Sequence, residues 1–246
     1  MQSVIAHTKM ELKLFFRETL AVLFTLIVPA ASFVIFGMMF KSQSYDGLDY
    51  FQAYIPSMLA IIIFTTAFFS LGLQIVIDRE KGVYKRLKGT PINQNAIFTA
   101  TIIKGFFAIY LSTIEILLIA KLGFGSALTK HPLQFFLALT LCAITFFALG
   151  FVISSLAKRM HTALGIAMVS MYPMLFLSGA TLPLNVFPDF LQKLAAIIPL
   201  TYVVNVLRYG WNGTMFTADA VLDLAVLVGM LIVAAVIGTK FFRWTD

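Results

Sequence analysis

The chain has 246 residues, of which 60% are hydrophobic and 12% are charged, and its formal net charge is +7. A soluble domain of this size could not bury so much apolar surface, so the composition excludes a soluble globular protein and indicates a membrane protein. The positive charge favours contact with anionic membrane lipids, whereas nucleic-acid binding would need a soluble basic surface that this sequence does not have.

The first segment, Met1–Thr19, mixes apolar and basic residues in an imperfect amphipathic pattern. Such a pattern predicts a helix that lies in the inner headgroup plane of a membrane. A frayed basic tail is the alternative. The residues that carry the pattern are Val4, Ile5, Met10, Leu14 and Phe15, placed among Lys9, Lys13 and Arg17.

Six apolar runs follow, each close to the length of about 20 residues that a helix needs to cross a hydrocarbon layer of roughly 30 Å. They are Leu20–Phe40, Ala53–Ile77, Ala96–Ala120, Leu133–Leu156, His161–Leu182 and Ala220–Thr239. Backbone groups in lipid must pair locally, and continuous runs exclude the alternating strands of a barrel, so we predict an all-α polytopic membrane protein with one transmembrane domain, 1–246. A cleaved signal peptide is an alternative for the first run, but that run continues to Phe40, which is too long for a signal core.

The Lys and Arg residues of the loops predict the orientation. With the N-terminus in the cytoplasm, twelve of them lie inside and five outside, while Lys104 lies within a span. Both termini are therefore expected to be cytoplasmic. The inside set is Lys9, Lys13, Arg17, Arg79, Lys81, Lys85, Arg86, Lys88, Lys158, Arg159, Lys240 and Arg243, and the outside set is Lys41, Lys121, Lys130, Lys193 and Arg208.

A charged segment, "DREKGVYKRLKGTPI" (Asp78–Ile92), follows the second run and has seven charged residues in its first eleven positions. An amphipathic helix here would present Val83, Tyr84 and Leu87 as an apolar anchor inside a basic rim. Asp78 and Glu80 would lie at its N-terminal end, where the helix dipole favours acids. The pattern is typical of a docking element, and an ordinary positively charged loop is the alternative.

Two ionisable residues, Lys104 and Glu115, lie inside the third run, where charges are costly and often functional. They are 11 residues apart, which puts them on one helix face but about 16 Å from each other, so they cannot pair together. The simplest interpretation is that Lys104 extends to the inner headgroups and Glu115 meets water, Lys121 or Arg208.

The outer segment, Pro183–Thr217, is too hydrophobic for a solvated loop. It contains two pieces, Asp189–Ile198 and Leu200–Tyr209, that are separated by Pro199 and are each too short to cross a bilayer. A re-entrant helical hairpin is predicted, starting at Pro188 and Asp189 and ending at Gly210 and Gly213. We interpret it as an outer gate; its expected gate residues are Pro188, Ile197, Pro199, Leu200 and Tyr202.

The sequence shows no pattern for catalysis, metal binding or nucleotide binding. The one cysteine, Cys142, lies within a span, and His7, His131 and His161 are assigned to different membrane faces, so neither a disulfide nor a metal site is expected. The phosphate-binding pattern GxxxxGK[ST] is missing, because "LKGTP" has Lys and Gly in the wrong order.

Two of these segments resemble those of type-2 ABC exporter permeases. The run "DREKG" before a short coupling helix is similar to the family's pattern, apart from Asp78 where Glu is frequent, and "FLSGATLPLNVFPDFLQKLAAIIPLTYVVNVLR" (Phe176–Arg208) is similar in the spacing of its Ser-Gly pair and prolines. The resemblance implies a permease domain in the cell membrane that pairs with a second permease copy or paralogue. It also implies two ABC ATPase subunits, which bind the ATP and Mg, and outward export of drugs, lipids or glycan-linked molecules, with no enzymatic activity and no cofactor in this chain. The residues that the resemblance assigns to ATPase coupling are Asp78, Arg79, Glu80, Lys81, Gly82, Val83, Tyr84 and Leu87.

Two other functions stay open at this point, an ion-coupled secondary carrier and a membrane scaffold without transport. A secondary carrier would be expected to show internal repeats, or broken helices with polar residues at mid-depth, and neither pattern is found in the sequence.

Overall fold

The computed structural model describes residues 2–17, 19–41, 44–45, 48–88, 94–181, 184 and 187–242. Helices dominate these residues, with one antiparallel pair of two-residue strands, β1 (Ser44–Tyr45) and β2 (Leu48–Asp49). The α-helices are α1 (Gln2–Arg17), α2 (Thr19–Val22), α3 (Val28–Phe40), α4 (Tyr50–Thr65), α5 (Gln74–Glu80), α6 (Val83–Lys88), α7 (Gln94–Leu118), α8 (Pro132–Leu156), α9 (Met160–Leu177), α10 (Asp189–Ala195), α11 (Pro199–Asn212) and α12 (Ala218–Phe241). Three π-helical segments, η1 (Leu23–Ile27), η2 (Thr66–Leu73) and η3 (Ile119–Gly123), continue α2, α4 and α7.

Six helices among the described residues are long and apolar enough to cross a membrane, as the sequence predicts. They are Leu23–Phe40, Tyr50–Glu80, Ala96–Gly123, Pro132–Leu156, Met160–Leu177 and Ala218–Phe241. The fifth ends before the expected Leu182, because Ser178 and Gly179 turn the chain and Gly179 has a φ of +79°. The second is longer than expected at both ends, since its helix continues through Asp78 to Glu80.

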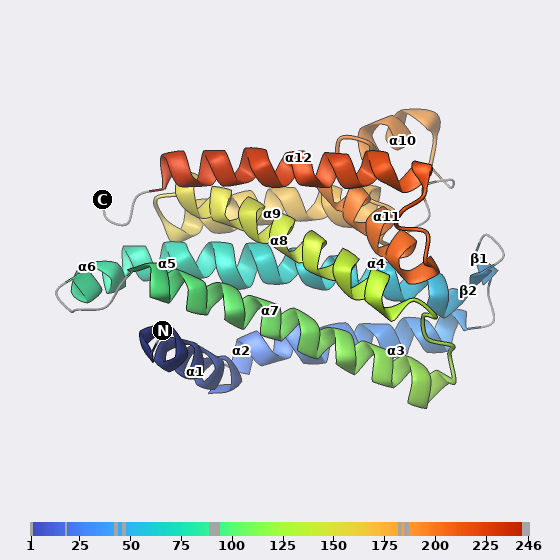
Figure 1. The fold of residues 1–246 in the computed structure, drawn as a ribbon, viewed down its shortest axis with the longest axis horizontal. Helices are drawn as coiled ribbons and strands as arrows, with labels where there is room; N and C mark the ends of the chain where they lie inside the picture. Colours follow the sequence, from blue (N-terminus) through green and yellow to red (C-terminus); the bar gives the residue numbers. More distant parts are fainter. Residues whose placement is uncertain are drawn as a thin grey trace.

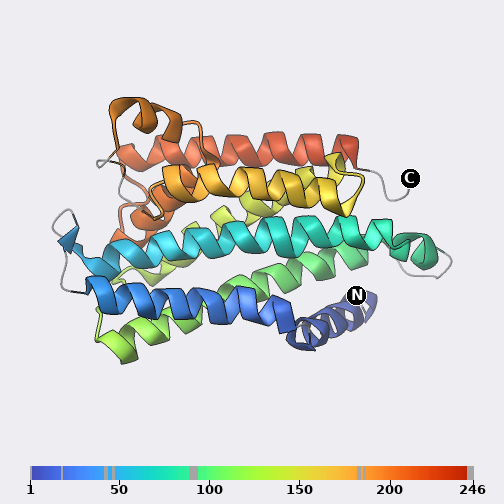
Figure 2. The same cartoon turned by 180° about the vertical axis from the view of Figure 1, so that it is seen from behind.

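The long helices lie side by side in one bundle (Figure 1). At one end of the bundle, here the α6 end, lie α6, the start of α1 and the end of α12. At the other, here the hairpin end, lie α10 and the two strands. Seen from behind, α3, α4 with α5, and α9 lie next to one another on one face (Figure 2).

Helix α8 is a central element of the core, with Phe135, Leu139 and Phe146 all fully buried. Its Gly150 packs so closely on η2 that a Cβ there would collide with the carbonyl oxygen of Ala67. Only a residue without a side chain permits this approach of two backbones. Gly150 of the fourth span therefore serves helix packing.

The outward faces of the helices carry large exposed apolar side chains. On α12, for example, Leu222, Ile232 and Val236 are all more than half exposed. A continuous apolar surface of this kind suits lipid contact and not water. The chain is therefore a multi-pass membrane protein.

Candidate functional site

The turn between α5 and α6 depends on Gly82. The backbone N–H of Lys81 bonds to Ile77 O (2.9 Å), and that of Gly82 bonds to Arg79 O (3.0 Å). Gly82 then takes a φ of +68°, a left-handed conformation that glycine adopts without strain, and α6 begins at Val83. This differs from the single helix expected from Asp78 onward. Asp78 and Glu80 belong to the last turn of α5 and do not begin the coupling helix.

Arg79 and Glu80 bind the connection between α8 and α9. The Arg79 guanidinium donates from Nη2 to the backbone oxygen of Ala157, and Arg79 is buried. The Glu80 carboxylate accepts a hydrogen bond from the backbone N–H of Met160 at 2.8 Å. Met160 is the first residue of α9, where backbone N–H groups have no partner in the helix and negative charge is favourable. We name these two contacts the loop clamp.

The exposed surface of helix α6 differs from the apolar anchor that the sequence predicts. Tyr84 is only 5% exposed, so its ring anchors α6 to the bundle and is not open to a partner. Burial also raises the pKa of the Tyr84 phenol, which keeps it neutral. Val83 is half-buried, and Lys81, Lys85 and Arg86 are exposed. The side chain of Leu87 lies outside the described part of the structure, as does the rest of the expected coupling segment, 89–92.

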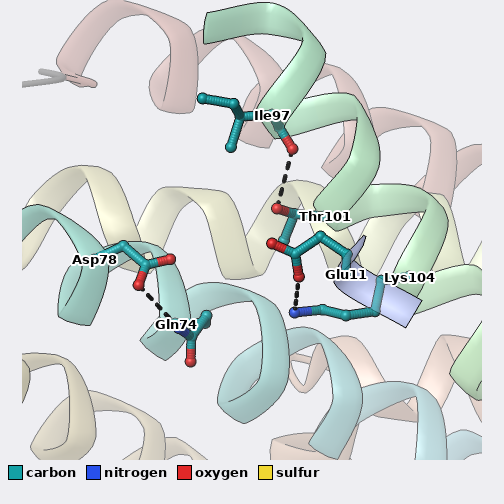
Figure 3. A network of polar contacts seen from close by, with 6 residues as sticks. All are labelled: Glu11, Gln74, Asp78, Ile97, Thr101 and Lys104. Atoms are coloured by element: carbon teal, nitrogen blue, oxygen red, sulfur yellow. Dashed lines mark hydrogen bonds and ion pairs between the residues drawn. The ribbon is translucent and has the colours of Figure 1, made fainter. Parts of the chain in front are cut away.

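A polar cluster joins α1, α5 and α7 near the α6 end (Figure 3). Lys104 pairs with Glu11 at a Nζ–Oε2 distance of 2.6 Å, and their side chains are 11% and 18% exposed. Beside them, Gln74 Nε2 donates to Asp78 Oδ1 at 3.0 Å, and Asp78 interacts electrostatically with both Glu11 and Lys104. Lys104 therefore holds α1 against α7 and does not extend freely to headgroups.

Glu11 was not anticipated from the sequence. It is the only acidic residue between Met1 and Arg17, and this isolated acid was the one feature of the sequence that could have indicated a partner for a cation. Phe15, one turn later, packs edge-on against Phe107 of α7 at 6.5 Å between ring centroids and is buried. Helix α1 is therefore packed on the bundle along one side, while Ile5 and Met10 stay exposed on another.

A cavity of about 850 Å³ lies on the face formed by α3, α4 and α9. Tyr50 and Gln74, which are 24 positions apart on nearly continuous helix, both line it. At a rise of about 1.5 Å per residue the cavity wall extends about 36 Å, comparable with the thickness of a bilayer's hydrocarbon layer. We name it the α3–α4–α9 cavity.

The lining of this cavity is mainly apolar and aromatic. Both π-helical segments of the first two spans contribute to it, η1 through Thr25 and η2 through Phe69 and Ser70. Such segments are often found at functional sites. Among the described residues that line the cavity, Lys104 and Arg208 carry charge and no carboxylate is present.

Arg208 reaches the cavity from α11. Its Nη2 donates to Ser57 Oγ of α4 (3.1 Å) and to the backbone oxygen of Gly179 (3.2 Å), which follows α9. Three separate parts of the chain therefore meet at this guanidinium. The structure thus places Arg208 at the wall of the cavity, while Glu115 lies half-buried on α7.

The outer segment forms two short helices, α10 and α11, that meet at an angle of 84°. Two side chains close the bend, since Thr201 Oγ1 donates to Ala195 O (2.7 Å) and Tyr202 Oη donates to Ala196 O (2.6 Å). Pro199 is the first residue of α11 and not a separator. Gly210 lies inside α11, and Gly213, with a φ of +79°, caps the end of this helix after Asn212.

The expected gate residues differ in burial. Leu200 is fully buried, Ile197 is 74% exposed, and Pro188 is the exposed N-cap of α10. Pro199 and Tyr202 are half-buried. A larger side chain at Ile197 would therefore disturb the internal packing less than one at Leu200.

A buried carboxylate in the sixth span went unnoticed in the sequence. Asp223 of α12 is 8% exposed and accepts side-chain hydrogen bonds from Asn205 and Tyr209 of α11. It fixes α11 to α12, which positions Arg208 on the same helix. The sequence could have identified Asp223, because an Asp within an otherwise apolar run is unusual in membrane helices.

Comparisons with known proteins agree with this arrangement. The chain matches the family profile described as ABC-2 type transporter over residues 2–211. It is 28% identical over 204 residues to a protein of Cyanophora paradoxa named as a transport permease, ycf38, covering 78% of this chain and 68% of that protein.

Two proteins of Escherichia coli (strain K12) are also similar. The inner membrane transport permease YadH is 24% identical, covering 77% of this chain and 76% of YadH. YbhR, named as a multidrug ABC transporter permease, is 23% identical, covering 79% of this chain and 52% of YbhR. These relatives are permeases and not enzymes, and their family works with an ABC ATPase subunit. The chain belongs to the ABC-2 type transporter family and is the permease subunit of an ABC transporter.

Proposed function

We propose that this permease exports an amphipathic or hydrophobic molecule through the α3–α4–α9 cavity, using ATP hydrolysed by a separate ATPase subunit. The observation that carries the proposal is the loop clamp. It joins the α5–α6 turn to the first residue of α9, and α9 contributes Met168, Met171 and Leu175 to the cavity wall.

The clamp offers a mechanical route for coupling. An ATPase that binds α6 and its exposed basic residues would move the α5–α6 turn as it opens and closes. Arg79 and Glu80 would pass this movement to α9, because rigid helices transmit displacement along their length. The cavity would then change shape in response to ATP that is bound by the partner subunit and not by this chain.

A second permease copy fits the same face. The cavity is flanked by exposed apolar residues of α3 and α9, among them Met38, Val169 and Tyr172. A dimer would cover these residues and close the cavity between two subunits, each with its own ATPase. The hairpin formed by α10 and α11 would close the path at the outer surface.

The proposal is tested with the permease and any ABC ATPase encoded beside it. We expect the two to copurify and to drive ATP-dependent uptake of fluorescent amphiphiles into inside-out membrane vesicles. Replacement of Val83 and Leu87 together by Asp should detach the ATPase at normal membrane abundance, whereas Lys193→Gln on α10 is the matched control. Uptake that follows an ion gradient and not ATP would contradict the proposal.

A further inference from the structure

We propose that the outer side of α1 binds anionic lipid head groups of the leaflet at the α6 end, and that this binding holds α1 in place as part of the wall of the α3–α4–α9 cavity. The partner is a lipid surface and not a soluble anion. The contact is independent of the transported molecule and of the direction of transport. It follows from the opposite charges on the two sides of α1.

The two sides of α1 differ in charge. Lys9, Lys13 and Arg17 are all exposed and recur every fourth position, so they form one row within an arc of about 80°. We name these three residues the α1 basic row. Glu11 lies about 160° from the middle of this row and pairs with Lys104 of α7 (Figure 3). The only carboxylate of α1 is therefore turned to the bundle, and its cations are turned away from it.

The charges of the α1 basic row are not compensated within the described part of the chain. No carboxylate among the described residues forms a salt bridge with any member of the row. Three cations spaced along one exposed side of a helix repel one another and attract an anionic surface. Each Lys or Arg near such a surface strengthens binding roughly fivefold.

Apolar side chains border the α1 basic row on both sides. Ile5 and Phe16 lie on one side of it, and Met10 and Leu14 lie on the other, and all four are 47–64% exposed. Such an arrangement suits the boundary between head groups and acyl chains, because apolar groups enter the acyl region while cations reach the phosphates. A soluble anion would leave these four side chains in water. The surface is therefore complementary to a lipid.

The place of α1 in the chain agrees with a lipid partner. The first span, Leu23–Phe40, begins six positions after α1 ends at Arg17, so the end of α1 is tied to the membrane boundary. The start of α1 lies at the α6 end of the bundle (Figure 1). Basic segments next to a span are attracted to anionic lipids in this way.

The inner side of α1 contributes to the cavity. Phe15 of α1 lines the α3–α4–α9 cavity together with Lys104, the partner of Glu11. Phe15 is also buried against Phe107 of α7. A lipid surface that holds the α1 basic row fixes the rotation of α1 about its own axis, which keeps Phe15 and Glu11 turned to the bundle. The lipid composition of this leaflet therefore acts on the α6 end of the cavity.

The test compares the full chain in nanodiscs of phosphatidylcholine alone and in nanodiscs that also contain phosphatidylglycerol. Hydrogen exchange of the backbone amides of α1, measured by mass spectrometry, should slow about fivefold or more with phosphatidylglycerol. Salt at about 1 M should remove most of this slowing, because it shortens the screening length to about 3 Å. Glycerol 3-phosphate added to phosphatidylcholine nanodiscs should not reproduce the slowing.

Variants locate the effect. The combined change Lys9→Gln, Lys13→Gln and Arg17→Gln should abolish the slowing, because it leaves the apolar borders intact and removes the charge. The charge-keeping change Lys9→Arg, Lys13→Arg and Arg17→Lys should retain it, which separates loss of charge from misfolding.

A matched control removes three exposed cations from other helix ends and the same amount of charge. It should retain the slowing. The control consists of Lys158→Gln, Arg159→Gln and Lys240→Gln.

Equal exchange of α1 in the two lipid mixtures overturns the proposal, and this comparison needs no variant. Retention of the slowing in the neutral variant of the α1 basic row also overturns it, as does equal loss in the matched control, which would show an effect of total charge alone. Slowing by glycerol 3-phosphate would exclude a lipid as the specific partner. If the neutral variant instead releases a copurified ATPase and lipid has no effect, the row binds that subunit.

Discussion

The Glu80 carboxylate accepts a hydrogen bond from the backbone N–H of Met160 at 2.8 Å, although 80 positions separate the two residues. Glu80 is the last residue of α5, and Met160 is the first of α9. The C-terminal end of one helix normally disfavours a carboxylate, and the N-terminal end of the other favours it. The contact therefore satisfies both helix ends and joins two membrane spans directly.

The first prediction concerns this contact. Glu80→Ala should speed hydrogen exchange of the Met160 amide about three- to tenfold, because one hydrogen bond contributes a net of about 0.5–1.5 kcal/mol. Export per ATP should fall while the ATPase stays bound. Exchange is measured by mass spectrometry, with the exposed neighbour Lys81→Ala as the control. An unchanged rate of hydrogen exchange at the Met160 amide would show that the Glu80–Met160 contact does not take part in coupling.

A second prediction concerns the turn at Gly82. No atom lies within 4 Å of a Cβ built there, so any penalty comes from the φ of +68° and not from crowding. Gly82→Val should destabilise the turn by roughly 1–2 kcal/mol, and Gly82→Asn by less, because Asn tolerates the left-handed region. Transport-coupled ATP hydrolysis should follow the same order. Equal activity of the two variants would show that the turn conformation does not matter for coupling.

The buried pair of Lys104 and Glu11 gives an asymmetric prediction. Lys104→Met leaves Glu11 and Asp78 near each other without their shared cation, whereas Glu11→Gln still leaves Asp78 to interact with Lys104. Loss of one partner of a buried pair costs on the order of 3–5 kcal/mol when the other charge is left uncompensated, so Lys104→Met should lower the thermal unfolding midpoint more than Glu11→Gln.

The double variant, Glu11→Gln with Lys104→Met, should recover part of the loss, because it removes the charge of Glu11 and its repulsion with Asp78. Lys9→Met changes an exposed cation of the same helix and serves as the control. Strictly additive effects of the two single variants would mean that the pair does not hold α1 to α7.

Helix packing is tested at Gly150. Gly150→Ala should separate α8 from η2 and lower stability, because its Cβ would collide with backbone and not with a movable side chain. Gly229→Ala is the matched control in α12, since nothing lies within 4 Å of its Cβ. That control should be neutral or stabilising by up to about 1 kcal/mol. The midpoint of thermal unfolding in detergent compares the two, and an equal response would contradict the close approach.

Orientation in the membrane is predicted from the Lys and Arg asymmetry. In a Cys142→Ala background, Lys85→Cys and Lys158→Cys should resist an impermeant thiol reagent in intact cells, whereas Lys130→Cys and Asp189→Cys should react. All four side chains are exposed, so accessibility within the chain does not bias the comparison. Labelling of Lys85→Cys from outside would reverse the arrangement.

The sequence by itself determined the number and position of the spans, because a run of about 20 apolar residues is a local property that lipid converts into a helix. It also determined the broken outer segment, since Pro188 and Pro199 start the two short helices by fixing φ and removing a donor. The short charged helix after the second span was also recognisable from its pattern, although α6 begins at Val83 and not at Asp78. These features can be predicted without knowing which other helices pack against each segment.

The partners of the charged residues were decided only by the tertiary structure. Helix periodicity correctly separated Lys104 from Glu115, yet it could not select Glu11, which meets Lys104 because α1 packs along α7. Likewise, Glu80 meets Met160 across 80 positions, and Arg208 meets Ser57 across 151 positions. Such contacts depend on which helices lie side by side. That choice is made by close backbone contacts such as Gly150 on Ala67, whose energy belongs to the packed bundle and not to any one segment.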